Sequence, residues 1–204
     1  MIKARKIRIA VVGCGRISKN HFGSIEQLND EYELVAVCDN NKETLSEHSS
    51  KYNVPGYPSI DELLENEELD LVTLCTPSGV HASQAVKASQ AKVHVITEKP
   101  MATKWEDGLA MVRACDEANV RLFVVKQNRR NSTLQLLKRA VIEKRFGQIH
   151  MVHLNVFWTR PQEYYDRASW SGTWDMDGGA FMNQATHYVD LMHWLVGPVE
   201  KIHA

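Results

Sequence analysis

The 204-residue sequence predicts an α/β fold in which a doubly wound parallel sheet is followed by the beginning of a second domain. Strand-like and helix-like segments alternate regularly to about residue 125, as in consecutive βα units. A glycine turn directly follows the first strand-like segment. The pattern changes after Asn128, so we expect one domain over residues 1–128 and the start of another over residues 129–204.

The first strand-like segment, Ile7–Val12, ends at two glycines, and the amphipathic segment Ile17–Leu28 follows them. Gly13 permits a tight turn, and Gly15 lets a ligand approach the backbone. The start of the following helix offers N–H groups and a partial positive charge to phosphates. This region therefore predicts a pyrophosphate site for a dinucleotide, although Ser18 replaces the third glycine of the fingerprint. The alternative is a glycine turn that binds no nucleotide.

The second strand-like segment, Glu33–Cys38, ends at Asp39, which lies 24 residues after Gly15. A dinucleotide fold places a ribose-binding acid about 20 residues beyond its glycine turn. The Asp39 carboxylate would repel a 2′-phosphate, and Asn40 and Asn41 supply no arginine to bind one. The sequence therefore predicts NAD rather than NADP as cofactor.

The later elements of this domain follow the same alternation. Two helix starts carry capping-box signatures, Ser59 with Glu62 and Thr103 with Glu106, and Pro55–Pro58 is a turn cluster. We expect further strands at Leu71–Leu74, Val93–Ile96 and Arg121–Val125, and helices at Lys42–Tyr52, Ile60–Asn66, Val80–Ser89 and Lys104–Ala118.

Polar loops follow two of these strands, at the sheet edge where open α/β sheets bind ligands. One loop holds Thr76 and Pro77, with His81 at the start of the next helix. The other contains Glu98 and Lys99, followed by a proline that raises the chance of a cis bond at Lys99–Pro100. A partly desolvated lysine suits proton transfer. The alternatives are an ordinary first-turn histidine and a surface Glu-Lys turn.

The region after Asn128 reads as an incomplete sheet with helices. One long strand and one starting strand do not complete a sheet, so we expect a fragment of a longer protein. The expected elements are a helix at Thr133–Lys144, a strand at Gln148–Phe157, a loop at Trp158–Tyr165, a helix from Gly179 to about Val196 and a strand from about Val199.

The helix after Gly179 carries a polar cluster. Asn183 and His187 are four residues apart and share a helix face, and Asp190 can support His187 from three residues further on. A zinc site built on His187, Asp190 and His193 lacks the His-Glu-x-x-His pattern and a convincing third ligand, so we predict no metal. A histidine that only packs in the core is the alternative for His187.

Bulk properties exclude several classes of function. The formal net charge of −1 gives no basic field for nucleic acid. No apolar stretch reaches the roughly 18 residues that a membrane span needs, and no hydrophobic signal region precedes the first strand. The sequence therefore predicts a cytoplasmic protein that binds neither nucleic acid nor membrane. Its cysteines lack zinc-ligand spacing and are expected to be reduced thiols: Cys14, Cys38, Cys75 and Cys115.

Taken together, these motifs resemble the Gfo/Idh/MocA family of NAD(P)-dependent oxidoreductases. The resemblance implies a Rossmann domain followed by an α+β domain with a large open sheet, which covers the active site and commonly forms the oligomer interface. It also implies a homo-oligomer, a dimer or a tetramer. The residues that carry it are Gly13-Cys14-Gly15-Arg16-Ile17, Asp39, Thr76-Pro77 with His81, Glu98-Lys99-Pro100, and Gly178-Gly179 through His187 and Asp190.

Within the family, the sequence is most similar to the WlbA/WbpB-type enzymes. These oxidise the 3-hydroxyl of the sugar nucleotide UDP-N-acetylglucosaminuronic acid, on the way to bacterial surface polysaccharide such as the O-antigen of lipopolysaccharide. Many family members have an aspartate at the position of Asn183, and because an amide cannot act as a general base, proton transfer falls to Lys99 and His187. The similar stretches are Arg160-Pro161-Gln162 with Tyr164-Tyr165-Asp166, Trp170–Trp174 and Asp177–Ala185.

The resemblance implies a role for each candidate residue. Lys99 accepts the substrate proton directly or shares it with His187, Asn183 orients the sugar, and Arg160 pairs with a carboxylate or a phosphate. The alternatives are a dehydrogenase of a free polyol such as inositol, or of another sugar, and a cofactor-sensing regulator without activity. The residues expected to bind NAD are Gly13, Gly15, Arg16, Ile17, Asp39, Thr76, Pro77, His81, Glu98 and Lys99.

Overall fold

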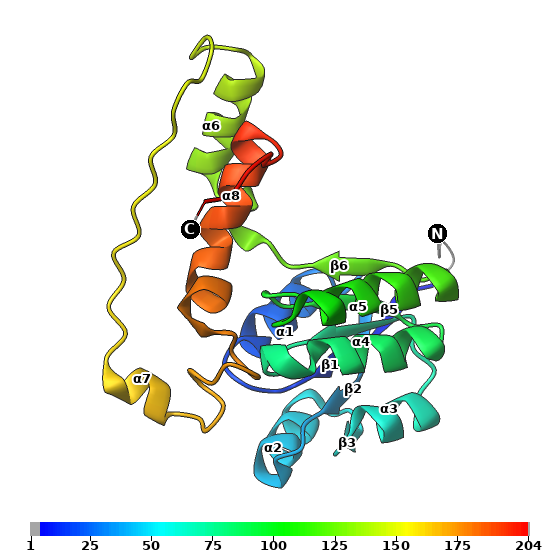
Figure 1. Cartoon of the computed structure of the whole chain (residues 1–204). Coiled ribbons are helices and arrows are strands. Elements are labelled where there is room, and N and C mark those ends of the chain that lie inside the picture. The colour runs from blue at the N-terminus through cyan, green and yellow to red at the C-terminus, as the bar shows by residue number, and fades with distance from the viewer. Residues whose placement is uncertain (1–4, 204) are drawn as a thin grey trace. The chain divides into compact units, whose positions relative to one another are not determined.

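The computed structural model describes residues 5–203 and divides into two compact units, one ending at Val125 and the other beginning at Lys126 (Figure 1). The units are described separately below. None of the helices among the described residues is long and apolar enough to cross a membrane.

The first unit is built on a six-stranded sheet with the order β3-β2-β1-β4-β5-β6. Every neighbouring pair of strands is parallel, which confirms the predicted doubly wound α/β fold. The strand order reverses between β1 and β4, so the loops after these two strands diverge there and leave room for a ligand. The strands are β1 Ile7–Val12, β2 Tyr32–Cys38, β3 Gly56–Tyr57, β4 Leu71–Leu74, β5 His94–Thr97 and β6 Leu122–Val124.

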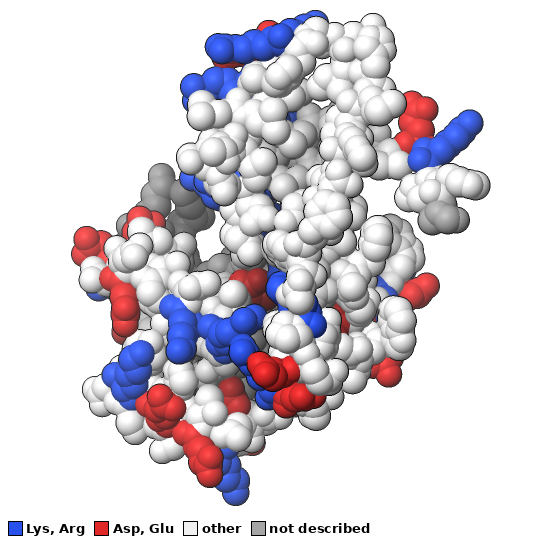
Figure 2. Space-filling view, turned by 90° about the vertical axis from the view of Figure 1, so that its left-hand side faces the viewer, with Lys and Arg blue, Asp and Glu red and all other residues white. Residues whose placement is uncertain are grey.

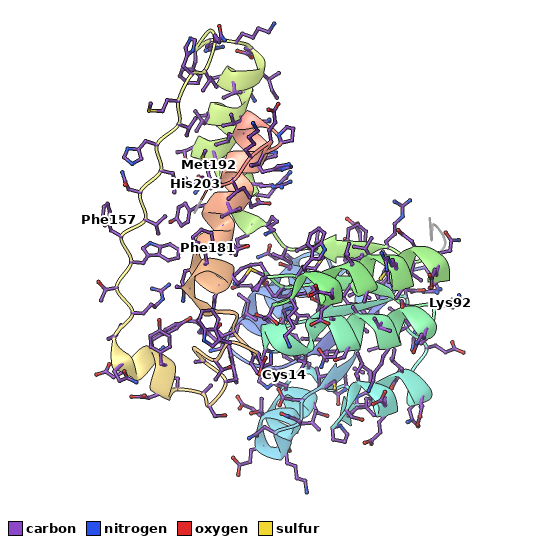
Figure 3. The ribbon with its side chains drawn as sticks, viewed as in Figure 1. Cys14, Lys92, Phe157, Phe181, Met192 and His203 are labelled. Atoms are coloured by element: carbon purple, nitrogen blue, oxygen red, sulfur yellow. The ribbon has the colours of Figure 1, made fainter. Side chains whose placement is uncertain are left out.

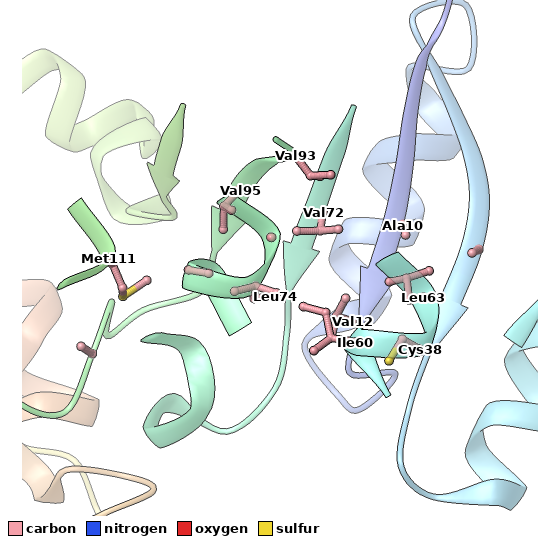
Figure 4. Close-up of a cluster of buried hydrophobic side chains, with 14 residues drawn as sticks. Ala10, Val12, Cys38, Ile60, Leu63, Val72, Leu74, Val93, Val95 and Met111 are labelled. Carbon is pink, nitrogen blue, oxygen red and sulfur yellow. The ribbon is translucent and has the colours of Figure 1, made fainter. Parts of the chain in front are cut away.

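Helices cover both faces of this sheet because successive strand residues point to opposite sides. Ile9 and Val11 of β1 pack in one cluster with residues of α1. Ala10 and Val12 pack in the other with residues of α3, α4 and α5 (Figure 4). The helices are α1 Ser18–Gln27, α2 Lys42–Tyr52, α3 Ile60–Asn66, α4 His81–Gln90 and α5 Trp105–Ala118, with the short 3-10 helix η1 Ser78–Val80 before α4.

Two local predictions in this unit need correction. The predicted turn at Pro55–Pro58 contains β3, a two-residue edge strand that pairs with β2 and is too short to show a strand pattern in the sequence. The capping box of Ser59 is confirmed, since its hydroxyl accepts a hydrogen bond from the Glu62 N–H. The capping box of Thr103 is wrong, because α5 begins one residue later with Lys104 as its N-cap.

All elements of regular structure in the described part of the second unit are helical. Lys138 of α6 donates a 2.5 Å hydrogen bond to the Trp194 carbonyl of α8, and its ammonium also lies over the Trp194 ring, so these two helices pack together. The elements are η2 Gln127–Arg130, α6 Ser132–Ile142, α7 Gln162–Asp166, the π-helical turn η3 Phe181–Ala185 and α8 Thr186–Val196.

The two strands predicted for this unit are not formed. In the described residues 143–161 and 197–203 the structure assigns no strand. A strand needs a hydrogen-bonded neighbour, and the segment predicted as Gln148–Phe157 runs without one. Phe157 projects from this segment and is 89% exposed (Figure 3). The predicted loop after it contains the short helix α7. The predicted helix from Gly179 to about Val196 is confirmed: it begins at Gly179, passes through the π turn η3 and ends with α8 at Val196.

Candidate functional site

The glycine turn after β1 is constrained by the loop after β4. Gly13 has φ +88°, and a Cβ there would lie 2.8 Å from the Cys75 carbonyl carbon and the Thr76 nitrogen. A Cβ at Gly15 would meet nothing within 4 Å. Ser18 is fully buried and donates from its hydroxyl to the Gly15 carbonyl at 2.6 Å. A small residue is therefore needed at position 18, and serine meets that need in place of glycine.

Asp39, at the end of β2, is joined to this turn. One carboxylate oxygen accepts a 2.8 Å hydrogen bond from the Cys14 N–H, and the other accepts one of 2.8 Å from the Asn41 N–H. Both bonds fix the carboxylate between the glycine turn and the start of α2. The first unit thus brings together the turn and the acid that the sequence predicted as cofactor-binding groups.

His81 joins the two polar loops. Its side chain is 1% exposed, with Nδ1 3.0 Å from the Pro100 carbonyl and Nε2 2.9 Å from the Thr76 carbonyl. Burial lowers the pKa of His81, and a neutral ring can donate to only one of these carbonyls. His81 therefore fixes the loop that carries Thr76 and Pro77. Its predicted place in the lining of the cofactor crevice stays a prediction.

Glu98 also faces inward, with 7% of its surface exposed. Its Oε1 lies 2.9 Å from His21 Nε2, and His21 Nδ1 lies 2.9 Å from the Thr73 hydroxyl. Because a carboxylate only accepts hydrogen bonds, His21 Nε2 carries a proton and donates it to Glu98. The other Glu98 oxygen accepts from the Lys99 N–H at 3.2 Å. Thr73, His21 and Glu98 thus form a buried chain that ends on the Lys99 backbone.

This chain shows that Glu98 supports its neighbour Lys99, and the place of Glu98 in the lining of the cofactor crevice stays a prediction. Burial alone would raise the pKa of Glu98, but the hydrogen bonds and charges of His21 and Lys99 together outweigh it and lower the pKa. Lys99 itself is half-buried after β5, and its bond to Pro100 is cis, as the sequence predicted. Sequence reasoning missed Thr73 and His21. The available signal was Thr73, a hydroxyl inside an otherwise apolar buried strand.

In the second unit, a buried carboxylate organises the segment around Asn183. Asp177 is 2% exposed and accepts hydrogen bonds from the Gly172 N–H at 2.8 Å and from the Asn183 side-chain amide. Asn183 lies in the π turn η3, and the buried His187 lies in the first turn of α8. The helix is continuous from position 183 to position 187, so the shared helix face of these two residues stays a prediction. Sequence reasoning assigned no role to Asp177.

Asp190 is bound mainly by a residue that sequence reasoning did not connect with it. Arg129 of η2 donates to both Asp190 oxygens, at 2.8 and 2.7 Å. Lys126 lies 3.9 Å from the same carboxylate and 3.4 Å from the Thr186 hydroxyl. Burial lowers the pKa of Lys126. Asp190 thus forms an ion pair between η2 and α8, and its predicted support of His187 stays a prediction.

Arg160 lines a pocket that lies entirely within the second unit and has a volume of about 440 Å³. Its guanidinium lies 5.0 Å from the ring centres of both Trp158 and Tyr164. The Arg160 Nε and the Gln184 Oε1 atoms are buried without a hydrogen-bond partner. The other lining residues are Val156, Trp158, Tyr165, Ala180, Phe181 and Ala185. Among residues 5–203, no group of three or more His, Cys, Asp or Glu side chains could hold a metal ion.

Comparison with known proteins agrees with this geometry. Residues 7–126 match a family model described as the oxidoreductase family with an NAD-binding Rossmann fold, and residues 134–204 match the GFO/IDH/MocA C-terminal domain. The chain belongs to the GFO/IDH/MocA oxidoreductase family. The predicted family and the Rossmann domain are thereby confirmed.

Two solved members of the family are similar to this chain at high identity. The WlbA dehydrogenase from Bordetella pertussis, in complex with NADH and UDP-GlcNAcA, is 61% identical with a TM-score of 0.94, over 96% of this chain and 60% of that one. The corresponding complex from Chromobacterium violaceum is 60% identical with a TM-score of 0.95, over 98% of this chain and 58% of that one. The predicted similarity to WlbA-type enzymes is confirmed.

Curated relatives of other activities are more distant. Myo-inositol 2-dehydrogenase from Thermotoga maritima is 28% identical over 97% of this chain and 58% of its own length. The chain therefore spans about three fifths of the length of these relatives.

Proposed function

We propose that the protein oxidises a secondary hydroxyl of a sugar nucleotide with NAD, namely the 3-hydroxyl of UDP-N-acetylglucosaminuronic acid, in the synthesis of bacterial surface polysaccharide such as O-antigen. The observation that carries the proposal is the 60–61% identity, over almost the whole chain, to two dehydrogenases crystallised with NADH and UDP-GlcNAcA. The inositol-type relatives are far less similar.

The residues of the first unit fit NAD. Gly13 brings the turn against the loop after β4, and the space above Gly15 is open where a pyrophosphate would approach the backbone. Arg16 and Ile17 at the start of α1 would hold that pyrophosphate. Asp39, fixed by two backbone N–H groups, would accept hydrogen bonds from ribose hydroxyls. When bound, NAD supplies the acceptor for the hydride that leaves the substrate carbon.

The protein side chains handle the proton and orient the sugar. Lys99 accepts the proton of the reacting hydroxyl, directly or shared with His187, because both side chains can exchange a proton near neutral pH when their environment shifts them. Glu98 and His21 hold the Lys99 backbone in place. Asn183, oriented by the buried Asp177, positions the sugar by hydrogen bonds and takes no proton.

We also propose that the protein acts in the cytoplasm as a homo-oligomer, a dimer or a tetramer. Large apolar side chains of the second unit that lie open, such as Met151 and Phe157, support an assembled form. Light scattering on the full-length protein measures its mass, and a monomer would contradict this part of the proposal.

The full-length protein should reduce NAD when UDP-N-acetylglucosaminuronic acid is added, with a ketone at sugar carbon 3 visible by NMR. Myo-inositol should give no comparable rate, and NADP should replace NAD poorly because of Asp39. Faster oxidation of inositol would favour the polyol alternative. Cofactor binding without oxidation of either substrate would favour the regulator.

A further inference from the structure

The buried carboxylate of Asp177 lies between two hydrogen-bond donors of the second unit. One oxygen accepts from the Gly172 N–H at 2.8 Å, and the other accepts from the Asn183 side-chain amide. The Asp177 N–H in turn donates to the Thr173 carbonyl at 3.0 Å. Because Asp177 is only 2% exposed, solvent does not compete for these bonds. Asp177 thus joins the loop around Gly172 to the helical turn that carries Asn183.

This arrangement limits the residue types that position 183 can hold. An ionised carboxylate only accepts hydrogen bonds, so the Asn183 atom that contacts Asp177 is the amide nitrogen Nδ2. A second carboxylate at position 183 would meet that of Asp177 at a buried site, where two like charges without a cation cost stability. Position 183 is therefore neutral because Asp177 holds the charge.

We propose that Asp177 is a positioning residue that keeps position 183 a neutral amide, and that this neutrality admits a sugar that carries its own carboxylate. The inference rests on the proposed function, whose substrate is a uronic acid. A single sugar ring separates the reacting hydroxyl from that carboxylate, so a negative charge at position 183 would repel the substrate. The charge of Asp177 itself is buried and offset by two N–H donors.

The test of selectivity measures ligand binding to the full-length protein by calorimetry, in the presence of NADH, which prevents turnover. The ligands are UDP-N-acetylglucosaminuronic acid and UDP-N-acetylglucosamine, which lacks the carboxylate. Asn183→Asp should weaken binding of the uronic acid about 10- to 100-fold more than binding of the neutral sugar, because of charge repulsion. Asn183→Ser, which loses the amide without adding charge, should weaken both alike. Equal weakening of both ligands by Asn183→Asp would overturn the selectivity.

The test of the positioning role exchanges the two residue types. Asn183→Asp alone should lower the melting temperature by about 3–8 °C, because two carboxylates then meet. Adding Asp177→Asn should restore most of this loss, because an amide at position 177 can accept from the Gly172 N–H and donate to a carboxylate at position 183. The double variant should still discriminate against the uronic acid. A melting temperature that stays low in the double variant would overturn the positioning role.

The matched control is an amide and a carboxylate on the surface of α7. The Gln162 amide donates to the Asp166 carboxylate at 2.8 Å, and both residues are exposed. Gln162→Glu should shift the melting temperature by less than about 1–2 °C, because exposed like charges repel weakly. A loss as large as that of Asn183→Asp would show that burial of Asp177 does not matter, which would contradict the inference.

The inference and the proposed function can fail separately. Charge discrimination by Asn183→Asp, in a protein that oxidises neither ligand with NAD, would support the inference and contradict the function. Oxidation of the uronic acid by the unaltered protein, together with no discrimination by Asn183→Asp, would support the function and contradict the inference.

Discussion

The two units differ most in how completely they bury apolar side chains. The first unit packs a cluster of buried residues on each face of its sheet. In the described part of the second unit, Leu191 is the one buried hydrophobic side chain, whereas Met151 and Ile202 are 85% and 84% exposed. In Figure 2, the upper part of the second unit presents mostly uncharged side chains. Burial of apolar side chains therefore stabilises the elements of the first unit, whereas the second unit exposes apolar surface of the kind that other protein surfaces usually bury.

The units also differ in how they hold charge near the candidate site. In the first, the Glu98 carboxylate is 9% exposed at its side chain and bonds to a histidine. In the second, the Asp190 carboxylate is 11% exposed and lies near two cations, Arg129 and Lys126. Removing His21 should therefore lower the free energy of unfolding more than removing Arg129, because Lys126 stays near Asp190.

The largest expected effect tests whether Lys99 of the first unit or His187 of the second accepts the proton. Lys99→Met should lower turnover of the full-length protein about 100- to 10,000-fold, because losing a general base typically costs that much. NAD affinity should be retained. The same measurement on His187→Asn shows whether the second unit shares the role, and we expect a smaller loss because Lys99 remains.

Lys87→Met is the matched control, because Lys87 is an exposed lysine of the first unit that pairs with Asp61. It should keep its turnover. If Lys99→Met turns over as fast as the control, Lys99 does not accept the proton. His187 would then be the candidate proton acceptor.

The next effect concerns one glycine with positive φ in each unit. Gly13→Ala should lower the free energy of unfolding by about 1–3 kcal/mol through backbone strain alone, and the overlap with immobile backbone atoms should add to this. Gly179→Ala, at φ +76°, should cost only the strain, because the atom in contact is at the end of the exposed Trp174 ring. Urea unfolding of both variants measures the difference, and equal losses would show that the loop after β4 yields as easily as the Trp174 ring.

The sequence predicts the elements of the first unit more accurately than those of the second. The bounds of β1, β4, α2 and α3 were predicted to the residue, because their apolar periodicity and caps are local signals. The strand at Gln148–Phe157 was wrong, since strand formation depends on a partner that local sequence does not reveal.

The candidate site shows the same limit. The place of Asp39 and Lys99 in the fold could be predicted, because each follows closely after the end of a buried strand. Their supporting partners could not. His21 and Thr73 are 52 residues apart in the chain, and they meet only because the helix α1 packs over the strand β4. Contacts of this range depend on the assembled fold and leave no spacing pattern in the sequence.

The buried chain on Lys99 gives the third prediction. His21→Phe removes the donor to Glu98 and should lower the free energy of unfolding by about 1.5–3 kcal/mol. It should also lower kcat about 10- to 100-fold through a misplaced Lys99, with NAD affinity unchanged. His21→Gln, which retains an N–H donor, should restore part of kcat. Arg129→Met, the corresponding change in the second unit, should cost less stability because Lys126 stays near Asp190.

The pH dependence of stability checks the same contact. Because the pKa of Glu98 is lowered in the folded protein, its contribution is fully present above its ordinary value of 4.5 and is lost as pH falls through the folded value. Glu98→Gln should therefore show a flatter loss of stability below about pH 4.5 than the unaltered protein, whereas Glu143→Gln, at an exposed position, should not. An unchanged slope in Glu98→Gln would contradict the lowered pKa.

The smallest expected effect compares the same helix cap in each unit. The Asn41 side chain accepts from the Thr44 N–H at 2.9 Å to cap α2, and the Asn131 side chain accepts from the Thr133 N–H at 3.1 Å to cap α6. Replacing either asparagine with alanine should cost about 1 kcal/mol, and replacing it with aspartate should cost almost nothing, because a carboxylate caps equally well.

The two losses should appear in different measurements. The helix α2 packs Leu45 and Tyr52 against a buried cluster, so Asn41→Ala should lower the melting temperature by about 2–4 °C. Neither helix contains a fully buried residue, but on α6 the apolar side chains of Leu136 and Ile142 are 62% and 67% exposed, so its ends can open without the rest of the protein. Asn131→Ala should therefore speed amide hydrogen exchange within α6 and shift the melting temperature less. Equal melting shifts for both variants would mean that the second unit unfolds together with the first, despite its sparse burial.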